Sequence, residues 1–147
     1  MNRSVLLILS LAGANEPIVA TPPNDECENA IPISGEGVFS FDSTGATASG
    51  PPLNDCEHTY GGSTGLDADV WFSWTPGRTA YYTIDTCGQT TVDTKIVVSW
   101  DPFCPTTPGE DCDDDGCLSQ SRVVTGADGH YPSLIRIGTQ PGLGGGK

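Results

Sequence analysis

The sequence predicts an all-β fold: an antiparallel, jelly-roll-like β-sandwich of about seven strands. Short apolar runs alternate with polar residues at a period of two, and no apolar stripe at helical spacing is long enough to form a helix. Glycine (19 residues) and proline (12 residues), together with Asn and Asp, separate these runs as turns would. A chain of 147 residues has the length of one domain, so we expect the strands to share one core.

The expected strands are 30–33, 37–47, 70–75, 80–86, 94–100, 121–125 and 131–138. Pro32 cannot donate to a ladder, so the first is an edge strand at best. In the second, Val38 lies on one face, and Phe39 and Phe41 lie on the other. Lys95 is expected to point outward. The sets expected to face the core are Val70, Phe72 and Trp74; Tyr82 and Ile84; Ile96, Val98 and Trp100; and Ile135 and Ile137.

The two ends of the chain predict a secreted fragment. Residues 1–14 combine one basic residue, an apolar run and the small-residue pattern Ala12-Gly13-Ala14, which is typical of a signal peptide; the alternative is a buried N-terminal strand or helix. A polar leader, 15–29, precedes a single sandwich domain, 30–147. The glycine-rich segment 139–147 has no returning strand after it, so we expect a truncated C-terminus and an unpaired edge on strand 131–138. No apolar stretch reaches the ~20 residues of a membrane span, so no membrane insertion is expected.

Six cysteines behind a signal peptide predict disulfides and an extracellular or cell-surface location. A zinc site is the alternative, but the chain lacks paired C-x-x-C or Cys/His spacings. Sequence alone leaves about fifteen pairings open. The pairing we favour is Cys112–Cys117, Cys27–Cys56 and Cys87–Cys104.

The net charge of -13 excludes nucleic acid as a partner, because few basic side chains are available to displace counterions from phosphate. The acidity indicates either solubility or cation binding. Within Asp111–Cys117, the acids Asp111, Asp113 and Asp115 followed by a glycine fit the first half of a calcium loop. Arg122 stands where an EF-hand requires glutamate, so a shorter calcium loop or a solvated acidic turn remains.

No catalytic residues are predicted, and we expect the chain not to be an enzyme. Residues 61–65 match the G-x-S-x-G motif around Ser63, but that motif requires a helix after the serine and a β-strand follows here. His58 and His130 are the available bases. A small hydrolase is therefore only a remote alternative. Paired carboxylates for glycoside hydrolysis cannot be selected from so many acids.

Two aromatic side chains are expected to face away from the core. Trp71 and Tyr81 fall on the opposite strand faces from their apolar neighbours, so they could form a platform that stacks on sugar rings. This pattern suggests a carbohydrate-binding module as an alternative function.

Several segments in series resemble the bacterial pre-peptidase C-terminal domain and its cysteine-containing relatives, over nearly all of the chain after residue 22. A final Gly-x-Leu-x-Ile-like strand, usual in that family, is missing. The segments are Pro23-Asn24-Asp25 with Cys27 and Ala30, Phe41–Thr47, Asp69–Trp74, Thr86-Cys87-Gly88, Val92–Ile96, Cys112-Asp113-Asp114 with Cys117, and Leu134–Gly138.

The resemblance implies a non-catalytic jelly-roll accessory domain of a larger secreted protein, which binds an extracellular polymer or protein or spaces other domains. It also implies structural calcium, because collagen-binding relatives hold this ion with an Asn-Asp pair and acids before the aromatic strand. Carried onto this chain, the ligands are Asn24, Asp25, Asp67 and Asp69. The alternative is that Asn24 and Asp25 cap a turn.

Overall fold

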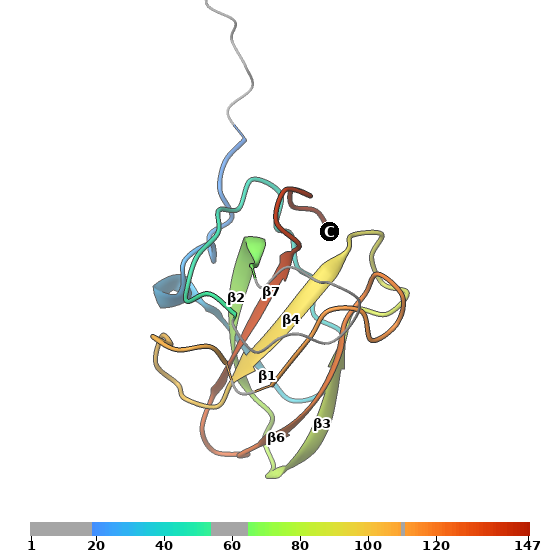
Figure 1. Cartoon of the computed structure of the whole chain (residues 1–147). Coiled ribbons are helices and arrows are strands. Elements are labelled where there is room, and N and C mark those ends of the chain that lie inside the picture. Colours follow the sequence, from blue (N-terminus) through green and yellow to red (C-terminus); the bar gives the residue numbers. More distant parts are fainter. Residues whose placement is uncertain (1–18, 54–64, 110) are drawn as a thin grey trace, which may run out of the picture.

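The chain folds into two facing β-sheets, as Figure 1 shows for a computed structural model that describes residues 19–53, 65–109 and 111–147. One sheet has five strands in the order β1-β2-β7-β4-β5, and the other pairs β3 with β6. A short 3₁₀ helix, η1 (Cys27–Asn29), precedes them. The all-β sandwich is thereby confirmed. The strands are β1 (Ile31–Ser34), β2 (Asp67–Thr75), β3 (Ala80–Asp85), β4 (Thr94–Ser99), β5 (Asp111–Asp113), β6 (Arg122–Ala127) and β7 (Ser133–Thr139).

Strand β7 lies in the middle of the five-stranded sheet. It pairs antiparallel with β2 through Phe72↔Ile135 and with β4 through Ile96↔Ile137. The prediction of an unpaired edge on strand 131–138 is therefore wrong. Two strands that precede β7 by many residues flank it on both sides, and period-two patterning contains no information about such long-range neighbours.

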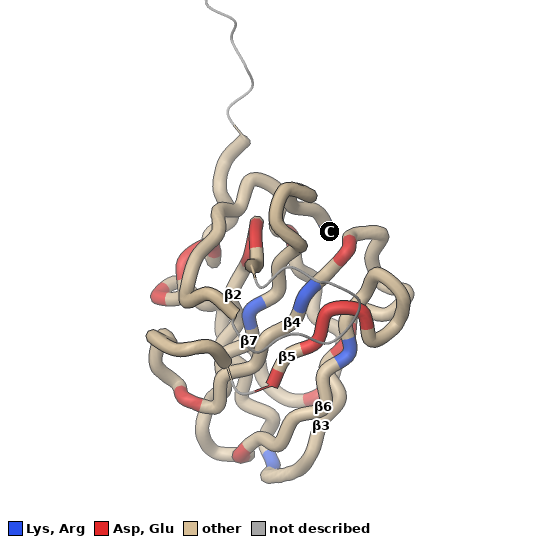
Figure 2. The backbone as a smooth tube through the Cα atoms, viewed as in Figure 1, with Lys and Arg blue, Asp and Glu red and all other residues tan. Residues whose placement is uncertain are grey.

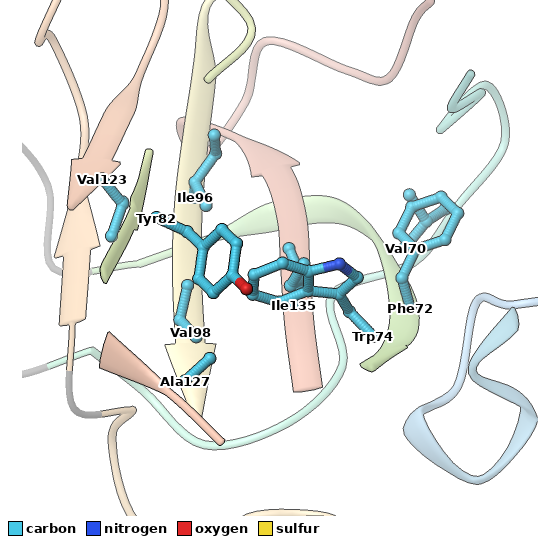
Figure 3. Close-up of a cluster of buried hydrophobic side chains, with 9 residues drawn as sticks. All are labelled: Val70, Phe72, Trp74, Tyr82, Ile96, Val98, Val123, Ala127 and Ile135. Atoms are coloured by element: carbon cyan, nitrogen blue, oxygen red, sulfur yellow. The ribbon is translucent and has the colours of Figure 1, made fainter. Parts of the chain in front are cut away.

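The core between the sheets comes largely from the sets of residues predicted to share faces, joined by Val123 and Ala127 of β6. Figure 3 shows Trp74 of β2 and Tyr82 of β3 in contact across it; their ring centroids are 4.9 Å apart and their planes meet at 85°. This edge-to-face arrangement suits the aromatic quadrupoles. The cluster is Val70, Phe72, Trp74, Tyr82, Ile96, Val98, Val123, Ala127 and Ile135.

Three local predictions are corrected. Residues 37–47 alternate as a strand would, yet no described strand pairs with them. The acidic segment that forms β5 was predicted as a loop and pairs with β4. Trp100 lies just after β4, is 54% exposed, and donates from Nε1 to Thr125 Oγ1 at 3.1 Å, so it is not part of the core.

Within the described residues, disulfides join Cys27 to Cys104 and Cys87 to Cys117, so all three favoured pairings are wrong. Cys112 is also disulfide-bonded. Its side chain packs against Leu53, Leu66 and Val97 on the outer face of the five-stranded sheet. Cys117 follows the end of β5 and reaches the loop after β3 instead. Proximity in sequence therefore did not decide the pairing: Cys112 lies within β5 and Cys117 lies beyond the turn that follows it, and the two contact different parts of the chain.

Asn24, Asp25 and Cys27 are buried, so the second half of the predicted leader packs against the sandwich. The predicted signal peptide, 1–14, lies outside the described residues. No helix in the described ranges is long and apolar enough to cross a membrane.

Candidate functional site

A groove of about 620 Å³ opens between the two sheets. Its floor is apolar and comes from β1, β2 and β7, through Ile33, Phe72, Trp74, Ile135 and Ile137. One wall is β3, and the other is the segment 35–41. The groove is therefore an opening of the sandwich itself, lined at depth by core side chains.

Both walls present backbone edges. Residues 81–86 all line the groove, without a gap. Successive side chains of a strand point to opposite faces, so one face alone could not supply such an unbroken run. The groove therefore meets the edge of β3. Within the described sheets β3 pairs only with β6, which leaves that edge open. In the opposite wall, the backbone of residues 37–41 makes no hydrogen bond to any described group. Unpaired backbone N–H and C=O groups on a strand edge are a template for another strand.

The two predicted sugar-stacking aromatics have different surroundings. Tyr81 is 85% exposed on the rim of the groove, where Phe39 of the opposite wall is 41% exposed. Trp71 is 1% exposed and cannot stack on a ligand, so that prediction is wrong. Trp71 faces away from the core as expected, but loops cover this outer face of the sheet; a Cβ on Gly50 would lie 2.7 Å from the indole ring.

Beneath those loops, Asp69 and Arg136 form a buried ion pair, with Asp69 Oδ2 2.7 Å from Arg136 Nη2. Asp69 also accepts hydrogen bonds from Ser49 N (3.0 Å) and Oγ (2.6 Å) and from Trp71 Nε1 (3.1 Å). The guanidinium lies 5.3 Å from the centroid of the Trp71 ring, within the range of a cation–π contact. Protein donors therefore occupy both carboxylate oxygens of Asp69.

The other residues that the resemblance assigns to calcium also bond within the protein. Asn24 Nδ2 donates to Trp71 O at 2.9 Å. Asp25 accepts from Thr47 N at 2.6 Å and from Thr47 Oγ1 at 3.0 Å. Asp67 accepts from Ala68 N and Gly142 N. Among the described residues these side chains do not form a cluster of carboxylates, and they fasten the leader and the 47–51 loop to β2.

The three acids of the predicted calcium loop do not lie around one point. Asp111 accepts from Thr125 Oγ1 at 2.7 Å, and Asp113 accepts from the backbone N–H groups of Gly116 (2.7 Å) and Arg122 (2.8 Å). Asp115 belongs to a different group, the acidic cluster Asp93, Asp114 and Asp115, in which one oxygen from each residue lies within 4.8 Å of the others. Sequence reasoning missed Asp93 and Asp114. The antiparallel pairing of β4 with β5 brings them together, and a spacing rule within one loop could not reveal it.

No catalytic arrangement emerges from the described residues. His130 is exposed, and its Nδ1 lies 3.2 Å from Asp128 Oδ1, with which it forms a surface pair. His58, Ser63 and all of the G-x-S-x-G motif except Gly65 lie outside the described residues.

Comparisons with protein-family models, curated proteins and solved structures find no match to this chain.

Proposed function

We propose that this chain is a non-catalytic accessory domain of a secreted protein, and that its groove binds an extended polypeptide segment by strand addition. The observation that carries the proposal is the pair of open backbone edges, β3 and residues 37–41, above an apolar floor. An inserted strand would bond to backbone on its edges and place alternate side chains on the floor.

The chemistry of the groove defines the segment that it favours. Residues facing the floor would be apolar, because Phe72, Ile135 and Ile137 line it. Residues facing solvent would be polar, and basic residues at the ends would complement the net charge of -13. Strand addition obtains affinity from main-chain hydrogen bonds, so the exact apolar residues matter less than their alternation.

An extracellular setting is part of the proposal. Disulfides persist in oxidising compartments, and Cys27–Cys104 and Cys87–Cys117 both join segments distant in sequence. The N-terminal sequence has the pattern of a signal peptide.

A carbohydrate-binding function is the second candidate, and the exposure of Tyr81 favours it. At 85% exposure on the rim of the groove, this ring is free to stack on a sugar. Because Trp71 is buried, the platform would depend on Tyr81 and the partly exposed Phe39.

The test uses the oxidised protein and two synthetic peptides. The first alternates valine and threonine over six residues, the length of β3, with a lysine at each end. The matched control replaces each threonine with proline, which has no N–H to donate. We expect calorimetric binding of the first peptide alone, with slower amide exchange at residues 37–41 and 81–86.

Two results would contradict strand addition: equal binding of both peptides, or no binding of either. Chito- or cello-oligosaccharides that bind the wild type and fail to bind Tyr81→Ala would instead support the carbohydrate function. Because Tyr81 points away from the core, its substitution leaves the groove floor intact.

A further inference from the structure

The acidic cluster is created by the pairing of two strands. Asp93 directly precedes β4, while Asp114 and Asp115 directly follow β5. The two strands are antiparallel with Ile96 opposite Asp113, so the start of one lies beside the end of the other. One carboxylate oxygen from each of the three residues lies within 4.8 Å of the other two.

Two buried oxygens of this cluster have no hydrogen-bond partner among the described residues. Asp114 is 1% exposed; its Oδ2 lies 3.2 Å from Lys95 Nζ and accepts from Gln140 Nε2 at 3.2 Å. Its Oδ1 and the Oδ1 of Asp93 are buried and bond to no described group. Buried carboxylate oxygens are normally satisfied, so these two atoms are acceptors available to a ligand.

The charge balance points to the same conclusion. Three carboxylates and the single amine of Lys95 sum to -3 + 1 = -2. Among the described side chains, this leaves an excess of two negative charges that a divalent cation would neutralise.

We propose that Asp93, Asp114 and Asp115 bind a divalent cation of the calcium class. All three ligands are carboxylates, which hard cations prefer, and Ca²⁺ binds oxygen at about 2.3–2.6 Å. Two oxygens on opposite sides of such an ion are ~5 Å apart, which accommodates the observed separations. The exposed side of the cluster at Asp115 admits the waters that complete the coordination.

The ion would fasten the edge of the sheet. Strand β5 has three residues and pairs only with β4 among the described strands. A cation held by residues at the start of β4 and the end of β5 would lock this pairing beside the Cys87–Cys117 disulfide. Lys95 repels the ion, so we expect a weak site, with Kd in the range of extracellular modules, about 10⁻⁴–10⁻³ M.

The experiment titrates chelator-treated, oxidised protein with calcium chloride by calorimetry at fixed ionic strength, and records the Tm with calcium and with chelator. We expect one saturable site and a higher Tm with calcium. Asp115→Asn, at the exposed end of the cluster, should weaken binding about tenfold or more. Asp101→Asn is the matched control, because Asp101 is exposed and outside the cluster.

Three results would overturn the proposal. The first is the absence of saturable heat and of a Tm change up to about 10 mM calcium, ten times the weak end of the expected range. The second is wild-type affinity in both Asp115→Asn and Asp93→Asn. The third is an equal loss in Asp101→Asn, which would mean that calcium only screens the net charge. Chelator-treated Asp115→Asn should melt no lower than the wild type, because the substitution relieves repulsion.

Discussion

Two basic side chains, Arg136 and Lys95, lie buried on the same face of the five-stranded sheet, on the adjacent strands β7 and β4, and their surroundings differ. Figure 2 shows a basic position on each of these strands, while acidic positions are spread over many loops. Arg136 pairs with Asp69, whose two oxygens also accept from Ser49 and Trp71. Lys95 pairs with Asp114, whose second oxygen has no described partner.

The difference follows from the number of carboxylates and donors in each region. At Asp69 one carboxylate meets a forked guanidinium, a hydroxyl, an indole and a backbone N–H. At Lys95 one ammonium faces a cluster of three carboxylates. The buried atom without a described partner is a donor in the first pair, Arg136 Nε, and an acceptor in the second pair, Asp114 Oδ1. A cation can bind only the acceptor, because a carboxylate oxygen offers a lone pair and a guanidinium N–H does not.

The disulfides should give the largest effects, because each closes a long loop in the unfolded chain. Cys27–Cys104 spans 77 residues and Cys87–Cys117 spans 30. On the chain-entropy scale, double alanine substitution should lower the free energy of unfolding by about 4.5 and about 3.6 kcal/mol respectively. Urea denaturation at one pH would measure both. A larger loss at the shorter loop would show that native packing outweighs loop entropy.

Asp69→Asn should lower the free energy of unfolding by about 3 kcal/mol, the lower end of the range for breaking a buried ion pair. The amide oxygen still accepts hydrogen bonds, but the charge of Arg136 is left buried and uncompensated. The control is the double variant Asp69→Asn/Arg136→Met, which removes that charge and should recover part of the loss. Calcium should rescue neither variant. A calcium-dependent recovery of Asp69→Asn would mean that this region, too, binds cations.

Lys95→Met should behave differently, because it leaves the three carboxylates without a compensating charge. In chelator we expect the free energy of unfolding to fall by about 2 kcal/mol. This is less than for the Asp69–Arg136 pair, because water reaches the exposed Asp115. Calcium should restore much of this loss and bind more tightly than in the wild type. Thermal unfolding with and without calcium measures the rescue. Equal losses in both conditions would mean that the carboxylates around Lys95 bind no calcium.

The sequence predicted the sandwich and its inward faces because period-two alternation is a local signal: Val70, Phe72 and Trp74 reach the core as expected. It could not predict what covers the other face. Trp71 and Lys95 were both expected to face away from the core, and they do, but both are buried at that face. The acidic cluster and the disulfides depend on which strands become neighbours, and that is decided by the pairing of segments far apart in the chain.

The smallest predicted effect is a pH dependence whose sign separates the cluster from ordinary surface acids. The pKa values of Asp93 and Asp115 are raised above 3.8, chiefly by burial and then by neighbouring aspartates. A raised pKa means that the folded state binds the proton more tightly, so stability is present at low pH and is lost as pH rises through the folded pKa. In chelator, Asp93→Asn/Asp115→Asn should therefore be more stable than the wild type at neutral pH, and this advantage should vanish towards pH 3.8.

Asp128 supplies a control of opposite sign. Its pKa is lowered, chiefly by the backbone N–H of His130, so its contribution is present at neutral pH and is lost as pH falls through the folded pKa. Asp128→Asn should thus be less stable than the wild type at neutral pH and approach it in acid. Tm measured by circular dichroism in chelator at several pH values gives both differences. If the Tm of both variants shifts in the same direction relative to the wild type, net charge governs the pH dependence. The local environment of Asp93 and Asp115 would then not determine it.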